Sequence, residues 1–164
     1  MANSETPKTI ILQLNERFSE RPLDEARVKA SNSITPGMLI AFDSGDVIPA
    51  AAGPTYPMVA VENPYLTPTY GSGKAIDTDY GNGDPEPCRY FIPQRGDMAY
   101  CLLDAGENVG RGDLLVVSGT TDGTLAAAGT IDATTVTGTL VAKAEEAVDN
   151  SGGGEAVRIR VRFL

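Results

Sequence analysis

The hydrophobic residues of this chain fall in short runs that suit β-strands better than helices. Clusters of Gly, Pro, Asp and Thr separate the runs, which is typical of strands joined by turns. The last run alternates strictly, which predicts a strand with one apolar face and one basic face. Its apolar side chains are Val157, Ile159, Val161 and Phe163, and Arg158, Arg160 and Arg162 lie between them. The six predicted strands lie near residues 38–42, 57–61, 98–103, 113–118, 138–144 and 156–163.

Several of these elements occur twice in the same order. The stretch Ile34–Phe42 reappears 75 positions later as Val109–Val117, each with a Gly two residues before its apolar run. Turn and strand units also recur by chance in β proteins, but four matched blocks in one order favour a duplication. We therefore predict a mainly β fold, a compact β-barrel or β-sandwich-like body built from two related halves. The other matched blocks are Ala50–Gly53 with Ala126–Gly129, Val59–Ala60 with Val141–Ala142, and Gly96–Leu103 with Gly154–Val161.

Residues 1–33 differ in composition from the rest of the chain. They contain none of the 18 glycines and hold five acidic and five basic residues. Within them Ile10–Leu14 can form a strand, and residues 22–30 fit either a short helix that begins at Pro22 or an extended segment. Because this segment is too polar to bury much surface, we predict an N-terminal arm over residues 1–33 and a β body over residues 34–164.

The first half also contains a long segment that the second half lacks. Residues 63–88 hold four Pro, four Gly, three Tyr and three Asp, which predicts an irregular loop. Loops of this length in compact domains are usually functional or disordered, and tyrosines suit contact surfaces because they offer a large area at low entropic cost. Tyr65, Tyr70 and Tyr80 are therefore candidate contact residues; the alternative is that they pack back onto the body.

Charge and composition narrow the classes of partner. The net charge of −9 lies in the body, and an acidic body repels phosphate, which argues against nucleic acid as a partner. No apolar stretch is long enough to cross a bilayer and the N-terminus does not resemble a signal peptide, so we expect a soluble protein without a membrane partner. Cys88 and Cys101 cannot make a disulfide framework; we expect ordinary thiols, with a single bridge between them as the alternative.

Candidate catalytic and metal-binding residues are scarce. The chain has no His, and most acids of the body lie in Gly-Asp turns, where turn geometry explains them. Asp77–Asp84 is superficially similar to a calcium loop, but Asn82 stands where that loop needs Gly and Cys88 where it needs the closing Glu. We predict no enzyme activity, no catalytic residue, no metal site and no cofactor; a hydrolase with two carboxylates that meet in space is a remaining alternative.

The second half carries an ordered set of motifs that resembles a known family. The set consists of Gly106–Val117, Thr121–Leu125, Leu140–Ala147 and Gly154–Val161, and it is similar to head decoration (cement) proteins of tailed bacteriophages. The resemblance covers about residues 34–164, and the loop at 63–88 departs from it. It implies a β-rich protein, commonly a homotrimer, at three-fold or quasi-three-fold positions on the outer capsid surface of the virion. Its partner would be the major capsid protein, and it would be made in the host cytoplasm.

The resemblance also gives the N-terminal arm an expected role. A polar arm with one β-capable stretch suits β-augmentation, in which main-chain hydrogen bonds add a strand to the capsid protein. Deleting residues 1–33 would then leave a folded body that no longer binds capsids. The runner-up function is a virion-surface adhesin or fibre-base module that displays the Tyr-rich loop. The candidate capsid contacts are Ile10, Ile11, Leu12, Leu14, Arg17 and Phe18.

Overall fold

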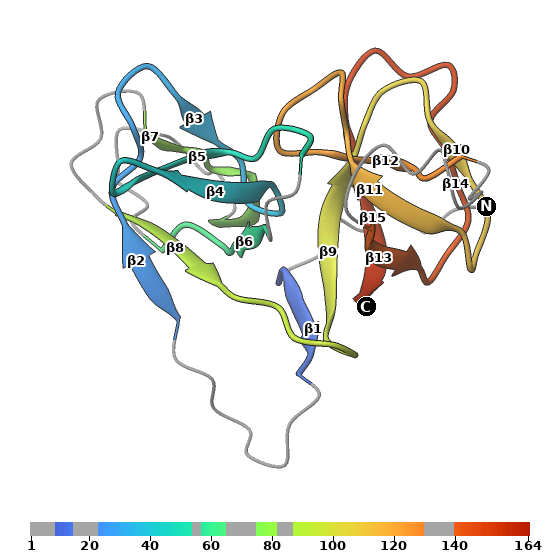
Figure 1. Cartoon of the computed structure of the whole chain (residues 1–164), viewed down its shortest axis with the longest axis horizontal. Helices are drawn as coiled ribbons and strands as arrows, with labels where there is room; N and C mark the ends of the chain where they lie inside the picture. The colour runs from blue at the N-terminus through green and yellow to red at the C-terminus, as the bar shows by residue number, and fades with distance from the viewer. Residues whose placement is uncertain (1–8, 15–22, 54–56, 65–74, 82–86, 130–139) are drawn as a thin grey trace.

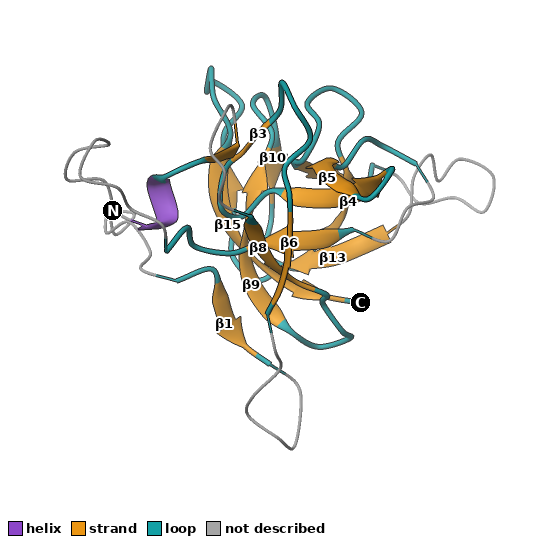
Figure 2. Ribbon diagram, turned by 90° about the vertical axis from the view of Figure 1, so that its left-hand side faces the viewer, coloured by secondary structure: helices purple, strands orange, loops and turns teal. Residues whose placement is uncertain are grey.

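The structure confirms a mainly β fold. It is a computed structural model that describes residues 9–14, 23–53, 57–64, 75–81, 87–129 and 140–164. Strands dominate these residues, and their one helical element is the 3-10 turn η2 (Ala75–Asp77) (Figure 2). The strands are β1 (Ile11–Gln13), β2 (Asp24–Ala26), β3 (Ser33–Ile34), β4 (Leu39–Asp43), β5 (Asp46–Pro49), β6 (Met58–Ala60), β7 (Tyr80–Gly81), β8 (Cys88–Phe91), β9 (Met98–Leu103), β10 (Asn108–Val109), β11 (Leu114–Val117), β12 (Leu125–Ala127), β13 (Leu140–Ala144), β14 (Val148–Asp149) and β15 (Val157–Phe163).

All six predicted strands are present, as β4, β6, β9, β11, β13 and β15. The alternation in β15 also has the expected result, since Ile159, Val161 and Phe163 are buried. The two-residue strands β7, β10 and β14 of the body were not predicted, and neither were three longer ones, β5, β8 and β12. Each of these three has only three or four residues, and Pro49 and Arg89 interrupt the apolar patterns of β5 and β8. Of the two alternatives for residues 22–30, the described part is extended and contains β2.

Five strands of the second half form a closed barrel. Their order is β9-β12-β11-β13-β15, and β15 pairs again with β9. The pairing of β12 with β9 is parallel and joins Leu125 to Leu103, whereas the other pairs are antiparallel. Closure gives every strand two neighbours, so the barrel leaves no long open edge.

The first half forms an equivalent barrel. Its strand order is β2-β8-β6-β4-β5, and a parallel bridge between Val28 and Val47 links the chain after β2 to β5. The Lys29 amide donates to the Val47 carbonyl at 3.0 Å, and the Val47 amide donates to the Arg27 carbonyl at 2.8 Å. Figure 1 shows the strands of this barrel on the left and those of the second barrel on the right, with β1 between them beside β9.

The two barrels match strand by strand, from β2–β8 in the first to β9–β15 in the second. The small sheet of β3 and β7 has its counterpart in β10 and β14. The register matches as well, because Glu25 faces Arg89 as Tyr100 faces Arg160. At the start of each barrel the counterparts are 75 residues apart, as for Val28 and Leu103, Ile34 and Val109, and Ile40 and Leu115. The duplication therefore extends to the hydrogen-bonding pattern.

The boundaries of the repeat differ from those predicted. The match of Gly96–Leu103 with Gly154–Val161 is wrong, because β9 opens the second barrel as β2 opens the first, while β15 corresponds to β8. Two other blocks are shifted by two residues. Ala50 corresponds to Ala128, since their amides donate to the equivalent carbonyls of Leu39 and Leu114. Ala60 likewise corresponds to Ala144, which changes the predicted match of Val59–Ala60 with Val141–Ala142. Similar short apolar strands align well in more than one register.

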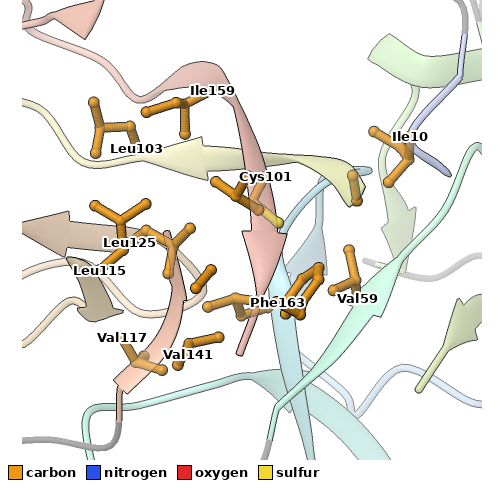
Figure 3. Close-up of a cluster of buried hydrophobic side chains, with 14 of the residues drawn as sticks. Ile10, Val59, Cys101, Leu103, Leu115, Val117, Leu125, Val141, Ile159 and Phe163 are labelled. Carbon is orange, nitrogen blue, oxygen red and sulfur yellow. The ribbon is translucent and has the colours of Figure 1, made fainter. Parts of the chain in front are cut away.

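Each barrel has an apolar interior, and a third group of side chains joins the two. Val59, Val61 and Phe91 of the first barrel belong to the same buried cluster as the interior of the second. The Phe91 ring meets the Phe163 ring edge to face, with centroids 6.2 Å apart. Figure 3 shows Phe163 between Val59 and the side chains of the second barrel. The interior of the first barrel is a separate cluster of Val28, Ile34, Ile40, Val47, Met58, Ala60, Tyr80, Cys88 and Tyr90.

The described part of residues 1–33 is not a separate arm. Residues 9–14 pack on the second barrel, where β1 pairs with the start of β9, and residues 23–33 supply strands β2 and β3 of the first barrel. The composition of this segment misled the prediction for a physical reason. Asp24, Glu25 and Arg27 point outward, whereas the small apolar surface of Ala26 and Val28 packs in the barrel interior. Main-chain pairing with β8 holds this segment despite its polarity.

Candidate interaction surface

The predicted capsid contacts in and beside β1 lie partly in the interior and partly on the surface. Ile10 is fully buried, and its carbonyl accepts a hydrogen bond from the Tyr100 amide at 2.8 Å. Its own amide donates to the Glu62 carboxylate. Ile11 packs against the same core and Leu14 is half-buried, so Leu12 is the one clearly exposed apolar side chain of the described set, at 37%. Ile10 is therefore part of the protein's own core. Arg17 and Phe18 lie outside the described residues.

The structure changes the role expected of Tyr80. Its ring is buried in the first barrel, and its hydroxyl donates to the carbonyls of Val61 and Glu62 at 3.0 and 2.7 Å. Burial raises the pKa of this phenol well above its usual value. Tyr80 is thus a core residue in β7, not a loop contact, and part of the 63–88 segment is regular. Tyr65 and Tyr70 lie outside the described residues. Tyr80, the one of the three tyrosines that the structure describes, is therefore not part of an exposed Tyr-rich surface.

Three exposed apolar side chains lie on segments next to the start of β9. The β9-entry surface consists of Leu12, Ile92 and Leu164, which are 37%, 48% and 44% exposed. Gln13 pairs with Met98 at the start of β9, and the Gly96 amide donates to the Phe163 carbonyl at 2.9 Å. Figure 1 shows β1 and the connection from β8 to β9 near the start of β9.

Sequence reasoning missed Ile92 and Leu164 as candidate contacts. Ile92 follows β8 as Phe163 continues β15, so the two residues occupy equivalent positions of the repeat. Phe163 is buried between the barrels, whereas Ile92 is exposed. In the correct register of the duplication, Ile92 is equivalent to Phe163, which lies at the interface between the barrels. That equivalence would have identified Ile92 as a candidate contact residue.

The basic face of β15 is neutralised by carboxylates. Arg158 pairs with Asp77 at 2.9 Å, Arg160 with Glu146 at 3.7 Å, and Arg162 with Glu145 at 2.6 Å. The hydrogen bond from Arg162 is the main reason that the pKa of Glu145 lies below its usual value. These pairs tie β15 to neighbouring segments and leave little free positive charge for a phosphate ligand.

A buried polar cluster joins three loops at the other end of the second barrel. The Asp104 carboxylate accepts hydrogen bonds from the Ser118 hydroxyl at 2.6 Å and the Ala105 amide at 2.8 Å. The Asn150 side chain donates to the carbonyls of Asp104 and Glu155, both at 2.9 Å. Asp104 is only 4% exposed. In the first barrel, the residues equivalent to Asp104 and Ser118 are Lys29 and Asp43, which form a salt bridge. Each barrel therefore has a polar contact between these two equivalent positions.

We predict that Asp104 makes the stability of the protein depend on pH. Burial raises the pKa of Asp104, but the hydrogen bonds from Ser118, Thr121 and Ala105 outweigh burial and leave it below its usual value. The stability that the ionised group adds is therefore complete above about pH 4, the pKa of an unfolded Asp, and is lost as pH falls through the lower folded pKa.

Urea unfolding of Asp104→Asn at pH 7 and at pH 3 measures this effect. We expect the free energy of unfolding of the variant to be about 1–3 kcal/mol lower than that of the wild type at pH 7, as for the loss of hydrogen bonds to a charged group. The difference should be smaller at pH 3. Ser151→Ala is the control, because it removes an exposed hydrogen bond from the Ser151 hydroxyl to the Asp149 carboxylate. Its free energy of unfolding should differ little from that of the wild type at either pH. An equal loss at both pH values for Asp104→Asn would exclude titration of Asp104 as the cause.

The two described acids of the candidate calcium loop have structural partners, whereas Asp84 lies outside the described residues. In the candidate calcium loop, Asp77 binds Arg158, and Asp79 accepts from Ser33 at 3.1 Å. No cluster of three or more potential metal ligands occurs among the residues that the structure describes. Cys88 and Cys101 are both buried and not bonded to each other, and burial raises the pKa of the Cys88 thiol to about 12. Within the described ranges, no helix has the length and hydrophobicity needed to span a membrane.

Three comparisons with known proteins gave one kind of match, a solved structure. No protein-family model matches the chain, and no curated protein matches it. Similar solved structures include a chain from the capsid of Myoviridae Phage XM1, with 15% sequence identity and a TM-score of 0.47. The match covers 100% of this chain and 99% of the other. At this level of similarity the comparison carries no conclusion about function.

Proposed function

We propose that this chain is a structural protein of a tailed-phage head that binds the outer surface of the mature capsid and stabilises it without catalysing a reaction. In this proposal it is a homotrimer at three-fold or quasi-three-fold positions, and the major capsid protein is its partner. The ordered motifs within residues 106–161 support the proposal, because they resemble phage decoration proteins.

The β9-entry surface is the observation that carries this proposal. Exposed apolar side chains that lie near one another mark interaction sites, and Leu12, Ile92 and Leu164 belong to three segments that each lie next to the start of β9. Strand β1 lies beside them at the edge of its six-stranded sheet. An edge strand can accept one more strand from a partner. Apolar contact and strand addition are thus available at the same end, where we place the capsid contact.

The proposed mechanism is mechanical. A protein that binds only the mature lattice stabilises that lattice by mass action, about 2.7 kcal/mol per site when its concentration is a hundred times the dissociation constant. A trimer engages several sites at once, so its overall affinity exceeds that of each contact.

Co-sedimentation with expanded empty heads of the encoding phage tests the proposal. We expect Ile92→Glu and Leu12→Glu to weaken binding at least tenfold, because each places a charge in an apolar contact. Phe42→Glu is the matched control. Phe42 is 55% exposed and lies on β4 of the first barrel, away from β9, so its change alters charge and hydrophobicity equally and should leave binding intact.

Two results would contradict the proposal. One is a wild-type protein that does not sediment with heads at any concentration. The other is equal binding by Ile92→Glu, Leu12→Glu and wild type at unchanged thermal stability, which would remove the β9-entry surface from the contact.

A further inference from the structure

The first barrel holds a turn of the second barrel in a groove. The Leu39 amide donates to the Gly123 carbonyl, and the Gly123 amide donates to the Ala50 carbonyl, both at 2.8 Å. The fit is close, because a Cβ on Gly123 would lie 3.2 Å from Met38 Cγ and from Pro49 Cβ. The turn that precedes β12 is therefore the part of the second barrel that inserts into the first.

The second barrel has the same groove, and no turn among the described residues fills it. A pocket of about 400 Å³ is lined by Gly112, Asp113, Leu114, Ala127, Ala128 and Gly129. Through the register of the repeat, these residues correspond to residues 37–39 and 49–51, which include the groove around Gly123. Leu114 N–H and Ala128 C=O are the counterparts of the two groups that bind Gly123 in the first barrel.

The first barrel also has the counterpart of the inserted turn. Gly45 precedes β5 as Gly123 precedes β12, and both have a positive φ, +96° and +82°. Whereas Gly123 is tightly enclosed, a Cβ on Gly45 would meet no atom within 4 Å. In the part of the chain that the structure describes, one molecule thus carries an empty groove on its second barrel and an unenclosed turn on its first barrel.

The surfaces around these two features are polar. Val59, Val61 and Phe91 border the filled groove, and their counterparts beside the open one are Lys143, Glu145 and Arg162. The residues of the second barrel on the side of its inserted turn include Tyr100 and Leu102. Their counterparts in the first barrel, on the side of the Gly45 turn, are Glu25 and Arg27. Charges of both signs on each side fit a contact between molecules that are also soluble apart, since such interfaces are more polar than cores.

We propose that the open groove of the second barrel binds the Ser44–Gly45 turn of a second copy of this chain. The contact repeats, between molecules, the one that joins the two barrels within a molecule. It is a head-to-tail contact, which closes into a ring or continues as a filament depending on the rotation between copies. The proposal does not depend on capsid binding.

Directed cross-linking tests the contact. If the contact repeats, Gly45 in one copy faces Ala127 in the next as Gly123 faces Pro49, with Cβ atoms near the separation that a disulfide bridges. Mixing Gly45→Cys with Ala127→Cys under mild oxidation should give a product of twice the chain mass. We expect a yield at least tenfold above that of either variant alone. The native cysteines do not interfere, because both are buried.

Sedimentation equilibrium gives a second measurement that needs no change in the strained turn. Ala128→Trp fills the groove and should raise the dissociation constant between copies at least tenfold, whereas Ala128→Ser should leave it unchanged. The proposal is overturned if the mixture cross-links no better than the single variants, or if Ala128→Trp associates like the wild type. Both measurements use the isolated chain, so their outcome is separate from that of the head-binding experiment.

Discussion

Deleting residues 1–33 is expected to unfold the first barrel. The deletion removes β2, so β8 loses one of its two neighbours, and β5 loses the parallel bridge between Val28 and Val47. It also removes Val28 from the barrel interior and Ile10 from the core between the barrels. An opened barrel exposes two strand edges and its apolar interior to water. Urea unfolding and amide hydrogen exchange should show loss of protection in β5 and β8.

Deleting residues 1–22 is the matched comparison. This shorter deletion removes β1 but keeps β2 and its pairing with β8, so we expect both barrels to fold with reduced stability. If the chain without residues 1–33 unfolds at the same urea concentration as the chain without residues 1–22, β2 is not needed to close the barrel. A binding experiment on the longer deletion would not isolate a role of the N-terminal segment, which is why the head-binding test uses single surface substitutions.

Phe163→Ala is expected to destabilise the protein by about 3–5 kcal/mol, the range for truncating a buried Phe. Phe163 is 3% exposed and packs against Phe91 across the junction of the barrels. Its truncation removes the aromatic contact and leaves a cavity that the rigid strands of two barrels cannot close. Equilibrium urea unfolding gives the free energy directly.

The repeat itself supplies the control for this substitution. Ile92 occupies the equivalent position of the first barrel but is 48% exposed, so Ile92→Ala should change stability by no more than about 0.5 kcal/mol. A large loss for Phe163→Ala beside a small one for Ile92→Ala would show that contact between barrels stabilises the protein. Equal small effects would mean that the barrels are stable independently of this junction.

Local pattern was enough to predict the class of the fold and most of the long strands. The alternation in β15 predicted which of its faces is buried, because the side chains of a strand point to opposite faces whatever its neighbours are. The duplication was also visible in the sequence, because Gly37 and Gly112 precede equivalent strands. In the structure both glycines have the positive φ that a tight turn needs.

The candidate site was much less predictable. Leu12 was expected at the surface and is exposed, whereas Ile10, two residues earlier in the same apolar stretch, is fully buried. Tyr80 looked like a loop residue because Gly, Pro and Asp surround it, yet its pairing with Ile34 places it in the interior. In each case burial depends on a strand that is distant in sequence.

The sequence by itself determined that this is a β protein with two related halves, because strand periodicity and turn residues act within a few positions of each other. Only the tertiary structure decided where the halves begin, that residues 23–33 close the first barrel, and that a described turn fills one barrel's groove but not the other's. These features arise from pairing across the chain and from the contact between barrels. Of the equivalent residues Phe163 and Ile92, Phe163 is core because it packs against Phe91 of the other barrel, whereas Ile92 is exposed.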